Sequence, residues 1–357
     1  MEGFRAEQDA IRCPTCGGQS AFVPEKGALV CQSCGTARDL TDPERDRAAR
    51  RETAYDPDNL PERDDDRPTA EPHVADGTHL HACTACGGQI VFTGHGLSEN
   101  CPYCNGAVVM GPVETAYATM GLIPFRIDAD EARDLARNWI SRRLAAPRDL
   151  SLATAEGRIA GLYAPFWTFD SDEAITYWAR YNVRSKKRTH VRNVQGAMRT
   201  RFDDLLVPAS PHVTALIRDG ILHDFRPADL RAFRPGYLAG FAAERHHQTV
   251  AEGLRMNEDD KALLIRNRIK AHEGRNDLYD IGYRTDTTGI HYRRILLPVW
   301  ILHYSHKGRA YRVVTSGIDG RTFGERPFSW PKLALYSGAI TAAAIAVGLA
   351  WGAAGFL

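Results

Sequence analysis

The cysteines restrict the fold of this sequence more than any other feature. All eight fall in four Cys-x-x-Cys pairs, and the first group of four recurs 70 positions further along the chain. The eight are Cys13, Cys16, Cys31, Cys34, Cys83, Cys86, Cys101 and Cys104. Gly-Gly-Gln follows the first pair of each group, so one short module appears twice.

Each module has the ligand spacing of a zinc ribbon. A Cys-x-x-Cys turn presents two thiolates from one knuckle, and two knuckles complete the tetrahedron of soft ligands that Zn²⁺ prefers. Redox-active dithiols and iron–sulfur ligation are the alternatives. Disulfides are disfavoured because the pairs lie inside a long chain, which also favours a reducing compartment. A closed set of four cysteines leaves no position for water, so we expect two structural Zn²⁺ ions.

The knuckles also need a permissive backbone after each second cysteine. Gly17, Gly35 and Gly87 fill three of these positions, and glycine adopts positive φ at no steric cost. Asn105 fills the fourth, and asparagine tolerates positive φ better than most residues.

Composition divides the chain into five segments. Residues 1–40 and 77–112 hold the first and second ribbon. Residues 41–76 are dense in both charge signs and interrupted by prolines, which predicts a flexible linker with a helical turn near 43–51. Residues 113–331 have a globular composition, and residues 332–357 form an apolar tail.

Periodicity predicts the elements of the globular segment. Apolar residues at spacings of three and four predict a helix from Asp128 or Asp130 through Ala145. Residues 175–201 form a long hairpin around the turn-like Ser-Lys-Lys-Arg, and residues 290–324 form strands joined by glycine turns. Residues 212–220 and 244–272 are expected to be helical.

The tail predicts a membrane anchor. Its last 25 residues carry no formal charge, and at 1.5 Å per residue they reach about 37 Å, enough to cross a bilayer. Cations outnumber acids just upstream, so the positive-inside rule leaves the N-terminal bulk in the cytoplasm. Small residues four apart, such as Gly348 and Gly352, allow a homo-oligomer through this helix. We expect no signal peptide at the N-terminus. The expected fold class is α+β: two small zinc ribbons, a mixed α+β domain with antiparallel hairpins, and one C-terminal transmembrane helix.

Motif searches favour a protein that is not an enzyme. The sequence has no GxxxxGK[ST], HExxH or GxSxG motif. The acidic run from Asp170 to Glu173 offers metal ligands, although we interpret it as a solvated strand end or turn. His246 and His247 are interpreted as surface residues of a helix, since adjacent positions point to different faces. We therefore expect no catalytic residues.

One basic region is a candidate for binding an anionic ligand. Its residues are Arg184, Lys186, Lys187, Arg188 and Arg192. Aromatic residues precede them in the chain, and such a combination binds nucleic acid or anionic headgroups. The alternative is an ordinary solvated hairpin with a basic turn, which we favour.

Four segments carry a resemblance to a known family: residues 161–167 (GLYAPFW), 202–210 (FDDLLVPAS), 240–245 (GFAAER) and 297–300 (LPVW). From the second ribbon to the terminal helix, the chain resembles bacterial zinc-ribbon membrane proteins described as primosomal protein N-prime (replication factor Y) superfamily II helicases or TFIIB-type zinc ribbon-containing proteins. The resemblance implies a role in membrane assembly or envelope stress, with SPFH-type or TPM-domain membrane proteins as partners.

The expected function follows from these features together. We expect a tail-anchored adaptor in the cytoplasmic (inner) membrane, single-pass, that recruits protein partners at its cytoplasmic face. The alternative is a membrane-tethered zinc-ribbon protein that binds nucleic acid, and it is not a motor helicase because the phosphate-binding loop is missing.

Overall fold

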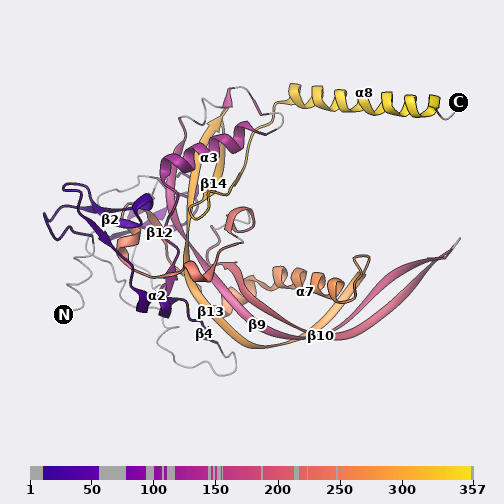
Figure 1. The fold of residues 1–357 in the computed structure, drawn as a ribbon, viewed down its shortest axis with the longest axis horizontal. Helices are drawn as coiled ribbons and strands as arrows, with labels where there is room; N and C mark the ends of the chain where they lie inside the picture. The colour runs from indigo at the N-terminus through magenta and orange to yellow at the C-terminus, as the bar shows by residue number, and fades with distance from the viewer. Residues whose placement is uncertain are drawn as a thin grey trace.

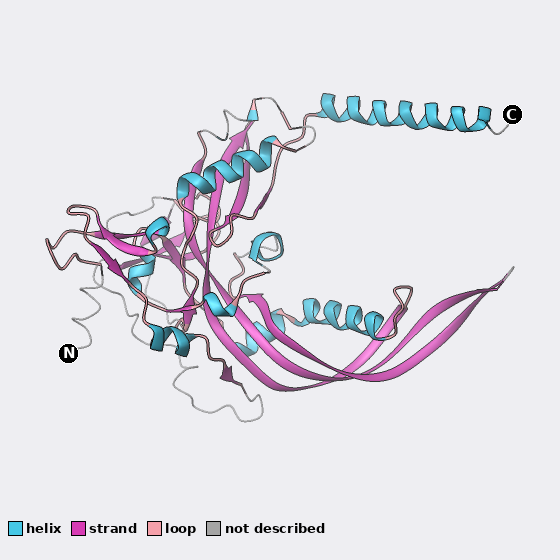
Figure 2. Ribbon diagram, in the orientation of Figure 1, coloured by secondary structure: helices cyan, strands magenta, loops and turns pink. Residues whose placement is uncertain are grey.

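The computed structural model describes residues 11–55, 78–93, 100–106, 108–110, 117–143, 146–147, 149–150, 154, 156–185, 188–212, 217–222, 224–246 and 248–354. Within these ranges the fold is mixed α+β with antiparallel hairpins, as the sequence predicts. Figures 1 and 2 show a body of short elements from which a long curved sheet and one isolated helix project.

Three long strands organise the main sheet. Strand β9 (Arg158–Ser185) pairs antiparallel with β13 (Tyr279–His306) on one side and with β10 (Arg188–Pro208) on the other. The predicted hairpin is therefore confirmed, and both its strands are longer than the periodicity indicated. Strand β13 continues through a turn into β14 (Arg309–Ser316), which pairs with β15 (Thr322–Gly324). Short strands complete this sheet: β4 (Thr53–Ala54), β8 (Gly121–Leu122), β11 (Arg231–Ala232) and β12 (Ala242–Glu244).

The far half of these strands leaves the body as a curved arm, which we define as residues 172–202 and 279–288 (Figure 1). Helix α7 (Glu258–His272) covers its inner face, where Ile265 and Ile269 pack against Ile175 and Tyr177. Side chains along β9 alternate between this buried face and an exposed outer face because successive residues of a strand point in opposite directions. The arm therefore has its own small core.

The first cysteine module packs on the body. Its sheet consists of β1 (Ser20–Val23), β2 (Ala28–Cys31) and β3 (Ala37–Asp39), with the 3-10 turn η1 (Pro24–Lys26) between the first two strands. Phe22 and Leu29 are buried against Tyr237. Helix α2 (Pro43–Ala49) follows, at the helical turn that the sequence predicts, and residues 56–77 lie outside the described residues.

The second module is part of the main sheet. Strands β5 (Thr78–Cys83), β6 (Gln89–Thr93) and β7 (Val108–Met110) pair with one another, and β6 also pairs with β12. The two modules thus lie on either side of one stretch of chain, residues 230–244, which we call the central segment. It contains β11, the 3-10 turn η5 (Pro235–Leu238) and β12.

The helices agree with the sequence in part. Helix α3 (Ala129–Ser141) is capped by Asp128, one of the two predicted caps, and it ends before the predicted Ala145. Helix α8 (Trp330–Ala354) lies at the predicted tail. The prediction of a helix over 244–272 is wrong at its start, because Glu244 ends β12 and helix α6 (Val250–Met256) begins only at the Thr249 cap. In the region 212–220 the described residues contain a short π-helix, η3 (Arg218–Leu222). A further 3-10 turn, η4 (Pro227–Asp229), precedes β11.

Candidate metal centres and apolar helix

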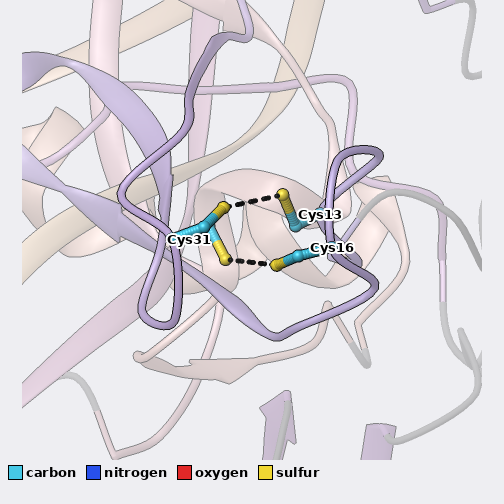
Figure 3. A group of neighbouring side chains, drawn as sticks. Cys13, Cys16 and Cys31 are labelled. Carbon is cyan, nitrogen blue, oxygen red and sulfur yellow. Dashed lines mark hydrogen bonds between the residues drawn. The ribbon is translucent and has the colours of Figure 1, made fainter.

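The first group of cysteines converges on one point. Cys13 and Cys16 come from the knuckle before β1, while Cys31 ends β2 and Cys34 lies in the turn after it. The Sγ atoms of Cys13 and Cys34 lie 3.6 Å apart, and those of Cys16 and Cys31 lie 3.5 Å apart. Figure 3 shows the side chains of Cys13, Cys16 and Cys31 directed toward one another.

The second group repeats this geometry. The Sγ atoms of Cys83 and Cys104 are separated by 3.5 Å, and those of Cys86 and Cys101 by 3.7 Å. Within each group of four, all the sulfur atoms lie within 4.8 Å of one another. A tetrahedral Zn²⁺ with bonds of about 2.3 Å places its sulfurs about 3.8 Å apart. Both groups are therefore compatible with zinc, and they consist of the eight cysteines that the sequence singled out.

The knuckles have the backbone that the sequence predicts. Gly17, Gly35 and Gly87 adopt φ values of 71°, 74° and 75°, and Asn105 adopts 62°. Each of these residues donates its N–H to the carbonyl oxygen of the first cysteine of its pair, at 2.8–3.0 Å. In the second module the backbone N–H of Gly106 donates to Cys104 Sγ, at 3.4 Å. Such contacts spread the negative charge of four thiolates.

The electrostatics of the thiols explain why these groups suit a cation. A hydrogen bond from the backbone of Cys16 lowers the pKa of Cys13 to about 6. In the second module burial raises the pKa of Cys86 to about 11. Sulfurs this close repel one another when ionised, so one module cannot hold four thiolates unless a cation compensates their charge.

The first module and helix α2, which follows it, are fixed to the central segment by ion pairs and a backbone hydrogen bond. Arg234 contacts Asp42 at 2.7 Å, and Arg231 contacts the buried Asp46 at 3.1 Å. Phe22 N donates to the carbonyl oxygen of Ala239 at 3.0 Å.

The second module is fixed by a buried polar cluster. Tyr103, which lies between Cys101 and Cys104, donates its hydroxyl hydrogen bond to Glu244. Ser210 donates to the other carboxylate oxygen at 2.7 Å. Burial raises the pKa of Glu244 to about 7. No local sequence pattern predicts this contact, because its partners are distant along the chain.

The acidic run from Asp170 to Glu173 corrects our interpretation. Asp170 and Glu173 are only 2% exposed, in the middle of β9, so they are not a solvated strand end. Glu173 accepts hydrogen bonds from Thr285 at 2.6 Å and Thr287 at 2.7 Å, and it pairs with Lys261. Partners far away in sequence therefore compensate its burial.

Asp170 belongs to a cluster with Glu52 and Asp204, whose oxygen atoms lie within 4.8 Å of one another. The guanidinium of Arg293, buried to 5% exposure, lies 2.6 Å from Glu52 and 2.5 Å from Asp204. Burial raises the pKa of Glu52 and of Asp204. A guanidinium beside these carboxylates supplies the charge that a metal ion would bring, so the cluster is a buried ion-pair network.

The histidine interpretation is also corrected. His246 is fully buried, and it forms an isolated bridge with Tyr117 rather than part of a helix. Its Nε2 lies 3.2 Å from the carbonyl oxygen of Phe166, and its ring packs edge-on against Trp167. His247 lies outside the described residues.

The basic region lies at the tip of the arm. Arg184, Arg188 and Arg192 are exposed, whereas Lys186 and Lys187 fall outside the described residues. Arg192 pairs with Tyr181 across the hairpin and Arg188 with Ser185, so these two arginines share a face of the ribbon. Arg184 lies three positions after Tyr181 and occupies the opposite face.

Helix α8 is long and apolar enough to cross a membrane. Its window from Trp330 to Trp351 has a mean hydropathy of 1.9, and none of the window is buried. Trp330 and Trp351, near its two ends, are 77% and 79% exposed. In Figure 1 the helix projects from the body as an isolated rod.

Comparison with known proteins gives one distant relative. The chain is similar to the uncharacterized protein YdjG of Bacillus subtilis (strain 168), with 24% identity over 337 residues that cover 92% of each chain. No family model matches the chain, and no solved structure matches it. The name of this relative states no activity.

Proposed function

We propose that the chain is a tail-anchored membrane scaffold that holds two structural zinc ions and recruits a protein partner on the cytoplasmic face. The exposure of α8 carries this proposal. A helix of 25 residues reaches about 37 Å, more than the roughly 30 Å hydrocarbon core of a bilayer. Leaving its apolar surface in water costs about 25 cal/mol per Å², and a bilayer removes that cost.

The charges beside α8 support a cytoplasmic body. Arg309, Arg312, Arg321, Arg326 and Lys332 precede or begin the helix, against Asp319 and Glu325. Cytoplasmic flanks carry such an excess of lysine and arginine.

The packing of the modules supports a structural role for zinc. Both are buried against the central segment, and a closed set of four thiolates leaves no position for substrate. Each ion would therefore stabilise the body by binding the folded chain only. We assign it no catalytic step.

The arm is the best surface for a protein partner. Trp178 is 49% exposed on its outer face and lies flat on Gly282, where a Cβ atom would sit 2.4 Å from the indole. Arg180 and Asp280 form a 3.0 Å ion pair on the same strands. A large aromatic ring bordered by charged residues is typical of interface hot spots. The family resemblance proposes an SPFH-type or TPM-domain membrane protein as this partner.

A second candidate function is nucleic-acid binding at the membrane. Arg188 and Arg192 favour it, because they share one exposed face at the tip of the arm. Binding of this kind falls steeply with salt, since each phosphate contact releases a counterion.

Affinity purification of the full chain from detergent-solubilised membranes, with and without nuclease, tests both functions. The scaffold proposal expects a stoichiometric membrane protein that survives nuclease and is lost with Trp178→Ala. Phe233→Ala is the matched control, since Phe233 is an exposed aromatic residue outside the arm. Nucleic acid that is lost in high salt and with Arg188→Ser/Arg192→Ser would instead establish the second candidate.

A further inference from the structure

A pocket lies where the body meets α8. It has a volume of about 330 Å³, within the range of small-ligand sites. Polar residues of α3 and α8 line it, namely Arg137, Asn138, Ser141 and Lys332. Ile140, Pro147 and Leu150 add apolar surface to the lining.

The two cations of this pocket retain hydrogen-bonding capacity. Lys332 uses one donor on the carbonyl oxygen of Ala146, at 2.7 Å, and an ammonium group has three. Arg137 has only a loose contact with Asp134, at 3.7 Å, and that carboxylate is 72% exposed. The Nε of Arg137 is buried and has no hydrogen-bond partner among the described residues. The Arg137 side chain as a whole is 38% exposed, and a guanidinium has five N–H donors, so its terminal nitrogens can donate to an acceptor in the pocket.

The neighbouring residues place the pocket at the depth of lipid headgroups. Trp330 and Phe328 are 77% and 54% exposed at the base of α8, and exposed aromatic rings gather at the membrane–water interface. Arg143 lies over Trp139 at 4.6 Å, and Arg326 lies over Phe328 at 4.6 Å. The positive charges thus surround the start of the apolar helix.

We infer that this pocket binds the phosphate of an anionic phospholipid, with Arg137 and Lys332 donating to the phosphate oxygens and the apolar lining residues contacting the glycerol and first acyl carbons. The inference rests on the proposed function, because only a membrane-anchored α8 holds the pocket at headgroup depth. Arginine and lysine clusters next to a membrane helix recognise anionic headgroups in this way. The contact would fix the orientation of the body on the membrane.

Native mass spectrometry of the detergent-solubilised full chain tests the inference directly. We expect one phosphatidylglycerol to remain bound under conditions that remove phosphatidylcholine. Thermal unfolding in detergent gives an independent measure, because a ligand that binds only the folded state raises the midpoint. Phosphatidylglycerol should raise it, whereas inorganic phosphate and glycerol 3-phosphate should not.

Two variants locate the effect. Arg137→Gln/Lys332→Gln should weaken phosphatidylglycerol binding at least tenfold, and the conservative Arg137→Lys should weaken it less. Arg142→Gln/Arg309→Gln removes the same charge from exposed positions outside the lining of the pocket and should leave binding unchanged. If the double pocket variant does not fold, the inference is tested by whether the wild-type chain retains phosphatidylglycerol in preference to phosphatidylcholine.

Three results would overturn the inference. Equal retention of the two lipids would exclude an anionic headgroup site, and equal effects of the two double variants would show only general attraction. An equal shift with inorganic phosphate would identify a soluble ligand. Alkaline carbonate extraction of membranes distinguishes failure of the lipid site from failure of the proposed function. A chain that carbonate extracts is not membrane-anchored, which contradicts the proposed function. A chain that stays in the membrane but shows no lipid preference contradicts only the lipid site.

Discussion

Tyr103 and Glu244, 141 positions apart in sequence, form a buried hydrogen bond that joins the second cysteine module to strand β12. The tyrosine follows a cysteine of the knuckle by two positions, and the glutamate ends a strand of the main sheet. Loss of this contact should therefore loosen the module from the body rather than disturb either part alone.

The protonation of Glu244 should make stability depend on pH. Its carboxyl has a pKa of about 7 when folded and 4.5 as the reference value, so between these pH values the folded chain holds a proton that the unfolded chain has lost. The free energy of unfolding is therefore highest below about pH 4.5 and falls by about 3 kcal/mol as the pH rises through 7.

Urea unfolding of the zinc-loaded chain between pH 5.5 and 8 measures this dependence. Glu244→Gln should flatten the profile, because the amide carries no titrating proton. Since both chains carry the same thiols, the difference between their profiles excludes the effect of zinc release. Identical slopes for both chains would refute the assignment.

Each cysteine group should bind one zinc ion independently. Cys31→Ser and Cys101→Ser should each lower the zinc content, measured by elemental analysis, from two ions per chain to one. Ser33→Ala, in the same knuckle as Cys31, should keep both ions because a hydroxyl at that position is not a ligand. Iron or fewer than two zinc ions in the wild-type chain would contradict the prediction.

Arg293 should be essential for the stability of the body. Arg293→Met leaves the carboxylates of Glu52 and Asp204 without their ion-pair partner and should cost about 3–5 kcal/mol in denaturant unfolding. Adding Glu52→Gln and Asp204→Asn should recover part of the loss, since the uncompensated charge is then gone. Arg201→Met removes a 58% exposed arginine near Asp170 and should cost less than about 1 kcal/mol. Similar losses for the two arginines would show that burial of the charge does not matter.

A charge in α8 should weaken membrane anchoring. Ala344→Arg places a cation near the middle of the helix and should cost about 2.5–3.5 kcal/mol of insertion free energy. Carbonate extraction should then release a larger share of the chain, and deletion of residues 331–357 should release all of it. Ala344→Leu should remain in the membrane pellet. A deleted chain that stays in the pellet would exclude α8 as the anchor.

Local patterns explain what the sequence could predict. The cysteine spacing, the Asp128 cap, the glycine and asparagine positions of the knuckles and the apolar tail each depend on residues within a few positions of one another. The structure contains all of these features where the sequence placed them. Two of the three strands of the arm were also predicted, as a hairpin around the Ser-Lys-Lys-Arg turn, whereas the part of β13 from Tyr279 to Thr288 was not.

The remaining features depend on partners that no local pattern reveals. Asp170 and Glu173 were interpreted as solvated because isolated charges are rarely buried. Their burial is compensated by distant partners, the backbone N–H of Asp204 and Arg201 for Asp170 and Lys261 for Glu173. His246 was interpreted as a surface residue of a helix because its bridge partner, Tyr117, is distant in sequence and no local pattern reveals it. Metal occupancy and partner binding stay predictions.

The position of the central segment between the two modules has a consequence for biosynthesis. A ribosome that has made the first module must add roughly 200 more residues before Tyr237 and Ala239 emerge to cover it. During that interval its apolar side chains Phe22 and Leu29 have no covering partner from the central segment, and long-range contacts of this kind form slowly. Zinc binding during synthesis would keep the first module folded until the central segment packs against it. Scarcity of the metal should therefore first appear as aggregation of newly made chains.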